Sequence, residues 1–212
     1  MYTPKYFAET RAEALHGLMR DYPFATVVAG AADGAVANHF PLELVGDALH
    51  GHVARGNELA QLDGAEVLVI FQGPQGYVSP NWYPTKAETH REVPTWNYAV
   101  VHVRGRLKVV EDAAWLRALL QRLTDRHEAT EPQPWRVNDA PDDHVEKMLH
   151  AIVGIEIAIE HVEGKFKLSQ NHPERNRLGV IAGLRRRDGD GDAELASLMA
   201  LQEKPKQEES PT

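Results

Sequence analysis

The chain of 212 residues contains no cysteine. Disulfide bonds, thiolate nucleophiles, iron–sulfur clusters and cysteine-based zinc sites are therefore excluded. Long apolar runs are missing as well, and none approaches the roughly 20 residues that a membrane-spanning helix requires. The opening segment, MYTPKYFAETRAE, lacks the charged-then-apolar pattern of a secretory signal. We therefore expect a cytoplasmic location and no membrane partner.

Basic residues are outnumbered by acidic ones. Lys and Arg total 23 against 31 Asp and Glu, which gives a formal net charge of −8. Because non-specific nucleic-acid binding requires a basic surface, this charge disfavours direct contact with DNA. Nucleophile-elbow, P-loop and dinucleotide-binding glycine motifs are all missing from the sequence. An enzymatic reaction would therefore depend on a bound cofactor.

The remaining composition is typical of a globular protein, with 42% hydrophobic and 25% charged residues. The length suits one domain with at most a small appendage. We predict a domain over residues 1–187, followed over 188–212 by a linker, a short helix and a disordered tail. The linker contains the oxygen-rich run DGDGD, but it lacks the Gly and Glu spacing of a calcium-binding EF-hand loop. A flexible linker is the preferred interpretation.

Local signals predict four main helices. Thr10 and Glu13 form a capping-box pattern, after which apolar residues recur at helical spacing. The predicted ranges are 11–21, 111–128, 142–150 and 173–187. Asn57 is a typical N-cap residue and predicts a further helix of one to two turns that ends near residue 62.

Short apolar or alternating runs between turn residues predict the strands. The predicted ranges are 24–29, 36–45, 48–54, 66–72, 97–110, 152–162 and 165–170, with a turn at Glu163-Gly164. The first three are expected to form an antiparallel meander, with Pro41 at an edge or a bulge. Six to eight short antiparallel strands with peripheral helices favour a mainly β fold built on a small closed or split β-barrel. Such a barrel fills its own interior, so a ligand would bind outside it, often at a dimer seam.

The segment 77–98 is unusually aromatic and is predicted to be a loop between two strands. It contains two of the four Trp and three of the six Tyr. Planar side chains mixed with hydrogen-bonding ones suit a planar, polar, anionic ligand. The side chains that would meet such a ligand are Tyr77, Ser79, Asn81, Trp82, Tyr83, Lys86, Thr95, Trp96 and Asn97. The alternative is a long loop whose own aromatic side chains attach it to the end of the barrel.

Histidines suggest a second kind of site. His50 and His52 share one face of a strand, and His39 lies in the run NHFP. Two His on one strand face can begin a metal or haem site. No third ligand lies near them in sequence, so hydrogen bonding to a ligand or to the next strand is the preferred interpretation, and no metal is expected.

Two further polar clusters could meet an anion. Arg55-Gly56-Asn57 lies between a strand and a helix start, where backbone N–H groups and an Arg attract phosphate. The run KFKLSQN, which begins at Lys165, alternates Lys with apolar residues and ends in amides before a helix. The alternatives are an ordinary helix cap with a surface Arg, and an edge strand protected by Lys.

Taken in order, the runs NHFPLEL, LHGHVARGN, GAEVLVIFQGPQGYVSPNWY, VPTWNY and KFKLSQN resemble the PaiB-type family of FMN-binding negative transcriptional regulators. The resemblance extends from MYTPKYF to the helix near Gly183. It implies a split β-barrel related to the pyridoxamine-phosphate-oxidase-like flavoproteins. It also implies a homodimer that binds FMN at the subunit interface with residues of both chains, and a link to repression of sporulation and degradative-enzyme genes.

The resemblance also implies site residues. Those expected near the FMN phosphate are His52, Ala54, Arg55 and Asn57, with Asn38 and His39 on a neighbouring strand. Those expected to border the ring are Tyr77, Ser79, Trp82, Thr95 and Asn97. Those expected from the partner subunit are Lys167, Gln170 and Asn171. Related oxidases carry Ser or Thr and Lys in the phosphate turn, where this chain has Ala54 and Gly56, so a weaker hold on the phosphate is predicted.

The sequence therefore predicts an FMN-binding homodimer with a regulatory or redox-sensing role. Three alternatives remain open. The same site would serve a flavin-dependent oxidoreductase that acts on a small substrate. The His cluster would serve a haem-binding split barrel. A DNA-binding repressor is disfavoured by the net charge and by the lack of a recognisable helix-turn-helix.

Overall fold

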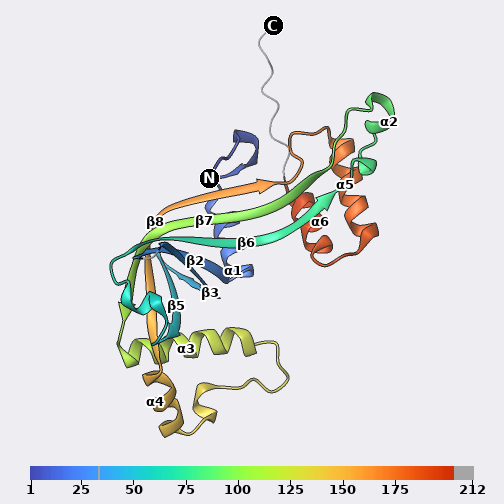
Figure 1. The fold of residues 1–212 in the computed structure, drawn as a ribbon. Helices are drawn as coiled ribbons and strands as arrows, with labels where there is room; N and C mark the ends of the chain where they lie inside the picture. Colours follow the sequence, from blue (N-terminus) through green and yellow to red (C-terminus); the bar gives the residue numbers. More distant parts are fainter. Residues whose placement is uncertain (33, 203–212) are drawn as a thin grey trace. The chain divides into compact units, whose positions relative to one another are not determined.

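A computed structural model describes residues 1–32 and 34–202. Its strands form one sheet in the order β3-β2-β6-β7-β8-β5-β4, and β1 pairs with β8. The strands are β1 Ala8–Glu9, β2 Phe24–Ala31, β3 Gly34–Pro41, β4 Glu43–Val45, β5 Ala48–Ala54, β6 Glu66–Val78, β7 Thr95–Val110 and β8 Ile152–Lys167. The α-helices are α1 Ala12–Asp21, α2 Lys86–Thr89, α3 Ala113–Glu128, α4 Asp142–His150, α5 Glu174–Arg187 and α6 Asp192–Leu201. Single 3₁₀ turns are η1 Lys5–Phe7, η2 Glu58–Gln61, η3 Pro80–Trp82 and η4 Val137–Asp139 (Figure 1).

The chain divides into two compact units. The terminal unit consists of Met1–Leu15, Gln72–Val101 and the chain from Glu163 onward. The central unit consists of His16–Phe71 and His102–Val162. The long strands β6, β7 and β8 each contribute residues to both units. The two units are described separately below.

In the central unit, β2 pairs antiparallel with both β3 and β6. Its side chains alternate, so that Ala25, Val27 and Ala29 are buried while the residues between them are more exposed. Val69 and Phe71 on β6 are also fully buried. This period of two is the pattern that predicted the strands, because successive side chains of a strand point to opposite faces.

The predicted meander is wrong as a continuous three-stranded unit, although two antiparallel pairs within it, β2 with β3 and β4 with β5, are present. β5 does not continue from β3 but pairs antiparallel with β4 and with β8, from Ala48 opposite Ala158 to Ala54 opposite Ile152. The predicted strand 36–45 is divided between β3 and β4 at Leu42, which is buried. A Cβ on Gly51 would lie 2.9 Å from the Leu42 side chain, so glycine at this position allows the chain to cross β5 closely.

The predicted turn at Glu163-Gly164 is also wrong, because β8 continues through it to Lys167. Gly164 pairs with Glu9 of β1. A Cβ on Gly164 would lie 2.2 Å from Leu15 Cδ2. This glycine therefore permits close packing of α1 on the strand, where the sequence suggested a change of direction.

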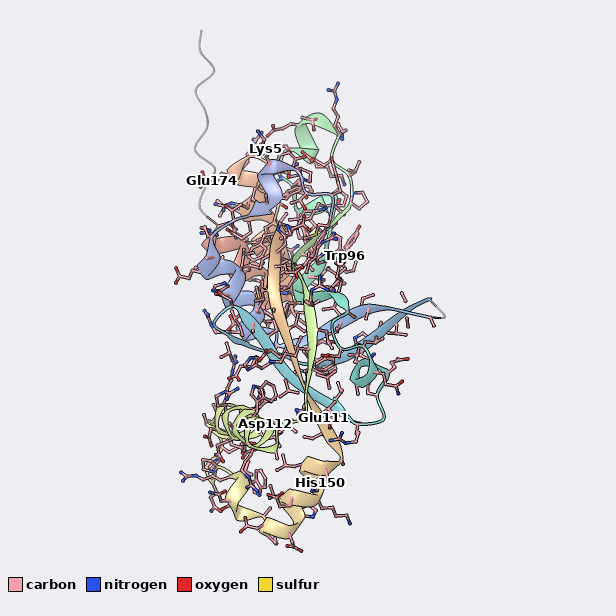
Figure 2. The ribbon with its side chains drawn as sticks, turned by 90° about the vertical axis from the view of Figure 1, so that its left-hand side faces the viewer. Lys5, Trp96, Glu111, Asp112, His150 and Glu174 are labelled. Carbon is pink, nitrogen blue, oxygen red and sulfur yellow. The ribbon has the colours of Figure 1, made fainter. Side chains whose placement is uncertain are left out.

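Helices α3 and α4 of the central unit share an apolar cluster formed by Leu116, Val137, Val145 and Leu149. The Asp112 carboxylate caps α3 by accepting hydrogen bonds from the backbone N–H groups of Ala114 and Trp115. Figure 2 shows Glu111 and Asp112 at the start of α3 and His150 at the end of α4.

In the terminal unit, α5 and α6 lie side by side (Figure 1). The run DGDGD that joins them is an ordered turn, with Asp188 and Gly191 in the left-handed region at φ 50° and 76°. The Asp192 carboxylate accepts a 2.7 Å hydrogen bond from Arg187 Nε and a 3.0 Å bond from the Gly189 backbone. The predicted disordered tail lies largely outside the described residues. No α-helix in the described part of the chain is long and apolar enough to cross a membrane.

Candidate functional site

The predicted site residues fall into two groups, one in each unit. The central unit holds Asn38, His39, His52, Ala54, Arg55 and Asn57. The terminal unit holds Tyr77, Ser79, Trp82, Thr95, Asn97, Lys167, Gln170 and Asn171. The sequence analysis predicted one site for all of these residues. Because the two groups lie in different units, each is described separately.

Asn38 and Asn57 of the central group are hydrogen-bonded to each other. Asn57 Oδ1 caps η2 by accepting from the Leu59 backbone N–H at 2.9 Å, as predicted. This bond fixes the orientation of the Asn57 amide, whose Nδ2 donates to Asn38 Oδ1 at 2.6 Å. Asn38 is oriented in turn, and its Nδ2 is buried without a hydrogen-bond partner in the part of the chain that the structure describes. A buried amide donor without a partner costs about 1–3 kcal/mol, so this atom is poised for an external acceptor.

His39 cannot act on the same ligand from the same side as Asn38. The two residues are neighbours on β3, so their side chains point to opposite faces of the strand. His39 Nδ1 lies 3.0 Å from Thr26 Oγ1, the residue directly opposite it on β2. Its ring stacks near Phe24, with the centroids 6.5 Å apart. His39 therefore belongs to the exposed face of the β2–β3 pair.

Arg55 already has three partners within the protein. Its Nε donates to the carbonyl oxygen of His150 at 3.0 Å, and its Nη2 donates to that of Ile152 at 3.2 Å. Its Nη1 forms an ion pair with Glu111 at 3.1 Å. The predicted helix after Asn57 is a single 3₁₀ turn, which is too short for a helix dipole to attract an anion. A phosphate at Arg55 would therefore compete with Glu111 for the guanidinium.

His50 and His52 share one face of β5, as predicted, but His50 contacts other side chains of the protein. Its ring packs on Trp115 with the centroids 5.0 Å apart, and its Nε2 lies 3.5 Å from Glu156. Burial lowers the pKa of His52 below its ordinary value, so its ring is neutral near pH 7. Within the described residues, no three His, Asp or Glu side chains gather closely enough to hold a metal ion. Ala54 ends β5, and its carbonyl oxygen accepts from the Asn57 backbone at 2.8 Å.

The predicted aromatic loop is shorter than expected, because β6 continues to Val78 and β7 begins at Thr95. Tyr77 therefore lies on a strand. Its exposed ring meets the exposed ring of Trp96 edge-on, with centroids 6.4 Å apart. Trp96 Nε1 donates to Gln75 Oε1 at 3.0 Å. These two rings remain available to a ligand or a partner.

Trp82 and Ser79 have structural roles. A Cβ on Gly183 of α5 would lie 2.2 Å from Trp82 Cδ2, so the indole lies directly against that helix. The guanidinium of Arg187 covers the same ring at 5.1 Å from its centroid. Ser79 Oγ caps η3 by accepting from Asn81 N at 3.2 Å. For Trp82, the structure agrees with the alternative that aromatic side chains attach this segment to the rest of the protein.

A cavity of ≈ 250 Å³ in the terminal unit brings several of the remaining candidates together. We call it the Lys167 pocket. Predicted residues that line it are Tyr83, Thr95, Asn97, Lys167 and Asn171. Lys167 Nζ donates to Thr95 Oγ1 and, at 2.7 Å, to the carbonyl oxygen of Trp96. Burial and the nearby charge of Lys165 lower the pKa of the Lys167 ammonium group.

The predicted site did not include several other residues that line the Lys167 pocket. The buried ring of Tyr83 stacks on His172 with centroids 4.8 Å apart and planes 15° apart. Glu92 and Ser169 complete its polar wall. Ser169 had been noticed in the run KFKLSQN, but Glu92 and His172 carry no local pattern that marks them.

Gln170 is separated from this pocket by its own hydrogen bonds. Its Oε1 accepts from the Leu168 backbone at 2.7 Å, and its Nε2 donates to the Phe166 carbonyl oxygen. It lines another cavity, of ≈ 290 Å³, together with Glu9 and Arg11. The Gln170 side chain thus hydrogen-bonds the backbone at the end of β8 and does not line the Lys167 pocket.

Comparison with known proteins identifies the family. The model of the family described as "Putative FMN-binding domain" matches residues 1–161. The chain is 33% identical over 205 residues to the protease synthase and sporulation protein PAI 2 of Bacillus subtilis strain 168, across 94% of this chain and 96% of that protein.

Solved structures identify the fold. The FAD and haem binding protein from Mycobacterium smegmatis matches with a TM-score of 0.59 at 24% identity, covering 76% of this chain and 73% of that one. The flavocytochrome Anf3 from Azotobacter vinelandii matches with a TM-score of 0.60 at 17% identity, covering 78% and 72%. The predicted split-barrel fold is confirmed, and the family match supports FMN as the cofactor. The chain belongs to the PaiB-type family of FMN-binding split-barrel proteins.

Proposed function

We propose that this chain forms a cytoplasmic, FMN-binding homodimer that acts as a regulatory, redox-sensing flavoprotein linked to transcriptional repression. Family membership supports the cofactor, and the name of the Bacillus subtilis relative, a protease synthase and sporulation protein, supports the regulatory link. The observation that carries the proposal is Asn38 Nδ2, a buried amide nitrogen that has no hydrogen-bond partner among the described residues. The net charge of −8 argues that repression does not require the chain itself to contact DNA.

The residues of the central unit fit the acceptor groups of FMN. The phosphate and the ring carbonyl oxygens of FMN all accept hydrogen bonds. Among the described residues, Asn38 Nδ2 has no such acceptor. Arg55 could hold a phosphate if it exchanged Glu111 for it, because an ion pair between two exposed side chains is weak. The two carbonyl oxygens held by Arg55 Nε and Nη2 would keep the guanidinium in place during that exchange.

When bound, FMN supplies reversible electron and hydride transfer. The protein's own residues supply position and charge. Asn57 orients Asn38 through the 2.6 Å amide hydrogen bond, and Asn38 then donates to the ligand. Arg55 contributes a fixed positive charge that favours a phosphorylated flavin over an unphosphorylated one.

Parallel titrations of FMN and riboflavin, followed by quenching of flavin fluorescence, test the cofactor site. Asn38→Ala should weaken FMN binding by about tenfold, the value of one hydrogen bond to a charged or strongly polar group. Arg55→Met should weaken FMN but not riboflavin. Glu111→Gln should strengthen FMN alone, because the carboxylate that competes with phosphate is gone.

Glu146→Gln is the matched control, since Glu146 pairs with Arg117 on the surface at 2.7 Å. It should leave both affinities unchanged. Equal affinities for FMN and riboflavin in every variant would remove Arg55 from the phosphate site. Wild-type protein that binds neither flavin would refute the cofactor proposal as a whole.

Other measurements separate the remaining parts of the proposal. Light scattering should give about twice the chain mass of 23.6 kDa for a homodimer. Bleaching of bound FMN by NAD(P)H at a catalytic rate would favour the oxidoreductase alternative. A Soret shift on adding hemin, lost in His52→Gln, would favour haem. Gel shifts that persist at physiological salt would establish direct DNA contact.

A further inference from the structure

We propose that the Lys167 pocket binds a neutral, planar ring whose edge carries a carbonyl group beside an N–H group, as in a lactam or an imide. The pyrimidine edge of a flavin has this chemistry, and so does a free pyrimidine base. The flavin source rests on the proposed function, whereas the pocket itself is independent of Asn38 and Arg55.

The buried amide of Asn97 supplies the first half of the recognition pattern. Asn97 is 1% exposed and lines the pocket. Its Nδ2 donates to Ser169 Oγ at 2.9 Å and meets the weakly accepting Met199 sulfur at 3.6 Å, while its Oδ1 has no hydrogen-bond partner among residues 1–32 and 34–202. The contact with sulfur supports this orientation of the amide. A ligand N–H group would satisfy the remaining oxygen.

Lys167 supplies the second half. An ammonium group has three N–H donors. Two of them have partners in Thr95 Oγ1 and the Trp96 carbonyl oxygen. The third can donate to a ligand carbonyl oxygen. The pocket therefore offers one donor from Lys167 and one acceptor from Asn97, which is the complement of a carbonyl next to an N–H.

The charge of the pocket favours a neutral ligand. Lys167 lies on one side and Glu92 lines the same pocket, so an anion would meet the carboxylate and a cation would meet the ammonium. Glu92 is held in place, because its Oε1 accepts hydrogen bonds from Thr85 Oγ1 and, at 3.2 Å, from Asn176 Nδ2. Its Oε2 lies 3.9 Å from His172 Nδ1.

The size and walls of the pocket favour a ring. The volume of ≈ 250 Å³ lies below the roughly 300–1,000 Å³ that is usual for drug-sized ligands, so a single ring, or the edge of a larger fused-ring system, fits better than a whole nucleotide. The apolar walls are formed by Phe7, Val93 and Pro94, and the aromatic wall by the stacked pair of Tyr83 and His172.

Ser169 adds an independent indication of a binding site. It is buried and adopts a left-handed conformation with φ 64°, which is unusual for a residue other than glycine. This backbone places its hydroxyl against Asn97. Unfavourable backbone conformations of this kind concentrate at ligand sites, where the surrounding structure maintains them.

The test uses two pairs of probes that differ by one methyl group. Lumiflavin and 1-methyluracil keep the imide N–H, whereas 3-methyllumiflavin and 1,3-dimethyluracil have lost it. Binding to the full chain is measured by calorimetry for wild type, Lys167→Met and Asn97→Ala. Lys165→Met is the matched control, because Lys165 lies two residues away and its Nζ bonds the Tyr2 carbonyl oxygen at 2.9 Å.

We expect at least one of the N–H probes to bind, and Lys167→Met to weaken it by about five- to tenfold. Its methylated partner should bind more weakly and should be insensitive to Asn97→Ala, since the bond that this variant removes is already lost. Binding of lumiflavin identifies the flavin ring as the occupant, and binding of 1-methyluracil alone identifies a separate ring ligand. Both outcomes support the proposal.

The proposal is overturned if neither N–H probe binds at millimolar concentration, or if Lys167→Met and Lys165→Met behave alike. Circular dichroism checks the fold of each variant, and Lys167→Met keeps the test valid if Asn97→Ala fails to fold. Weaker FMN binding in Asn38→Ala with unchanged lumiflavin binding would separate the pocket from the phosphate site proposed above.

Discussion

Replacing Asp192 with Asn tests how the turn between α5 and α6 holds the aromatic segment in the terminal unit. Asp192 is 2% exposed and accepts hydrogen bonds from Arg187 Nε, Arg187 Nη2 and the Gly189 backbone. The same guanidinium donates to the Tyr77 carbonyl oxygen at 3.0 Å and covers the ring of Trp82. One carboxylate therefore orients an arginine that contacts β6 and η3.

The expected cost of Asp192→Asn follows from these bonds. Asn keeps the shape and one oxygen but loses the charge. Hydrogen bonds to charged groups contribute about 1.5–3 kcal/mol, and Arg187, whose side chain is 36% exposed, regains part of this from water. We expect a loss of about 1–2 kcal/mol in the free energy of unfolding. With a urea m-value of about 2.5 kcal/mol/M, the midpoint should fall by about 0.4–0.8 M.

The effect should depend on pH with a defined sign. The hydrogen bonds from Arg187 lower the pKa of Asp192, against the opposing effect of burial, and the Gly189 N–H lowers it further. A group whose pKa is lower in the folded state stabilises the protein above its unfolded pKa, here 3.8, and this contribution is lost as pH falls through the folded value. The difference between wild type and Asp192→Asn should be complete at pH 7 and should shrink below about pH 4.

Urea unfolding followed by tryptophan fluorescence at pH 7 and pH 3 measures both effects. The control is Asp190→Asn, a change of the same kind at an exposed residue of the same turn. Equal midpoints for wild type and Asp192→Asn at pH 7 would refute the reasoning. A difference of the same size at pH 3 would show that the cost does not come from the charge of Asp192.

Three other changes have expected outcomes. Gly183→Ala should lower the melting temperature through a loss of about 1–3 kcal/mol, because its Cβ meets the ring of Trp82 at 2.2 Å; Gly17→Ala in α1, with no atom within 4 Å, should be neutral or stabilising. His52 should titrate below 6.5 by NMR, and since burial lowers its folded pKa, its contribution should destabilise the protein as pH falls below 6.5; an unchanged pH dependence in His52→Gln would contradict this. Arg55→Met should speed amide hydrogen exchange where α4 ends and β8 begins, because the carbonyl oxygens of His150 and Ile152 lose their donor; unaltered exchange would show that these bonds are dispensable.

Local sequence signals predicted the individual elements well. The ranges 48–54 and 142–150 agree with β5 and α4, and Asn57 caps η2 as its residue type suggested. These features depend on alternation, helical period and side-chain caps, which act over a few residues. The long irregular motifs predicted the family and its flavin, and the comparisons confirm both.

Glycines show where local reasoning fails. Gly164 was predicted to be part of a turn, yet it lies within β8, and both Gly164 and Gly51 of β5 permit close contact with other segments. The order of the strands in the sheet decides which segment packs against each glycine. The pairing of β5 with β8, for example, joins residues about a hundred positions apart. No local pattern encodes such a pairing, because it is selected by the burial of the whole sheet.

By itself, the sequence determined the family, the split-barrel class, most helices and strands, and the set of polar and aromatic residues available to a ligand. Only the tertiary structure decided which of them are free to bind. Trp82 packs against α5, and Arg55 donates hydrogen bonds to two backbone carbonyl oxygens. Lys167 and Asn97, in contrast, line one pocket together with Glu92 and His172. The physical reason is that a side chain's role depends on its hydrogen-bond partners, and these partners come from segments far apart in the chain.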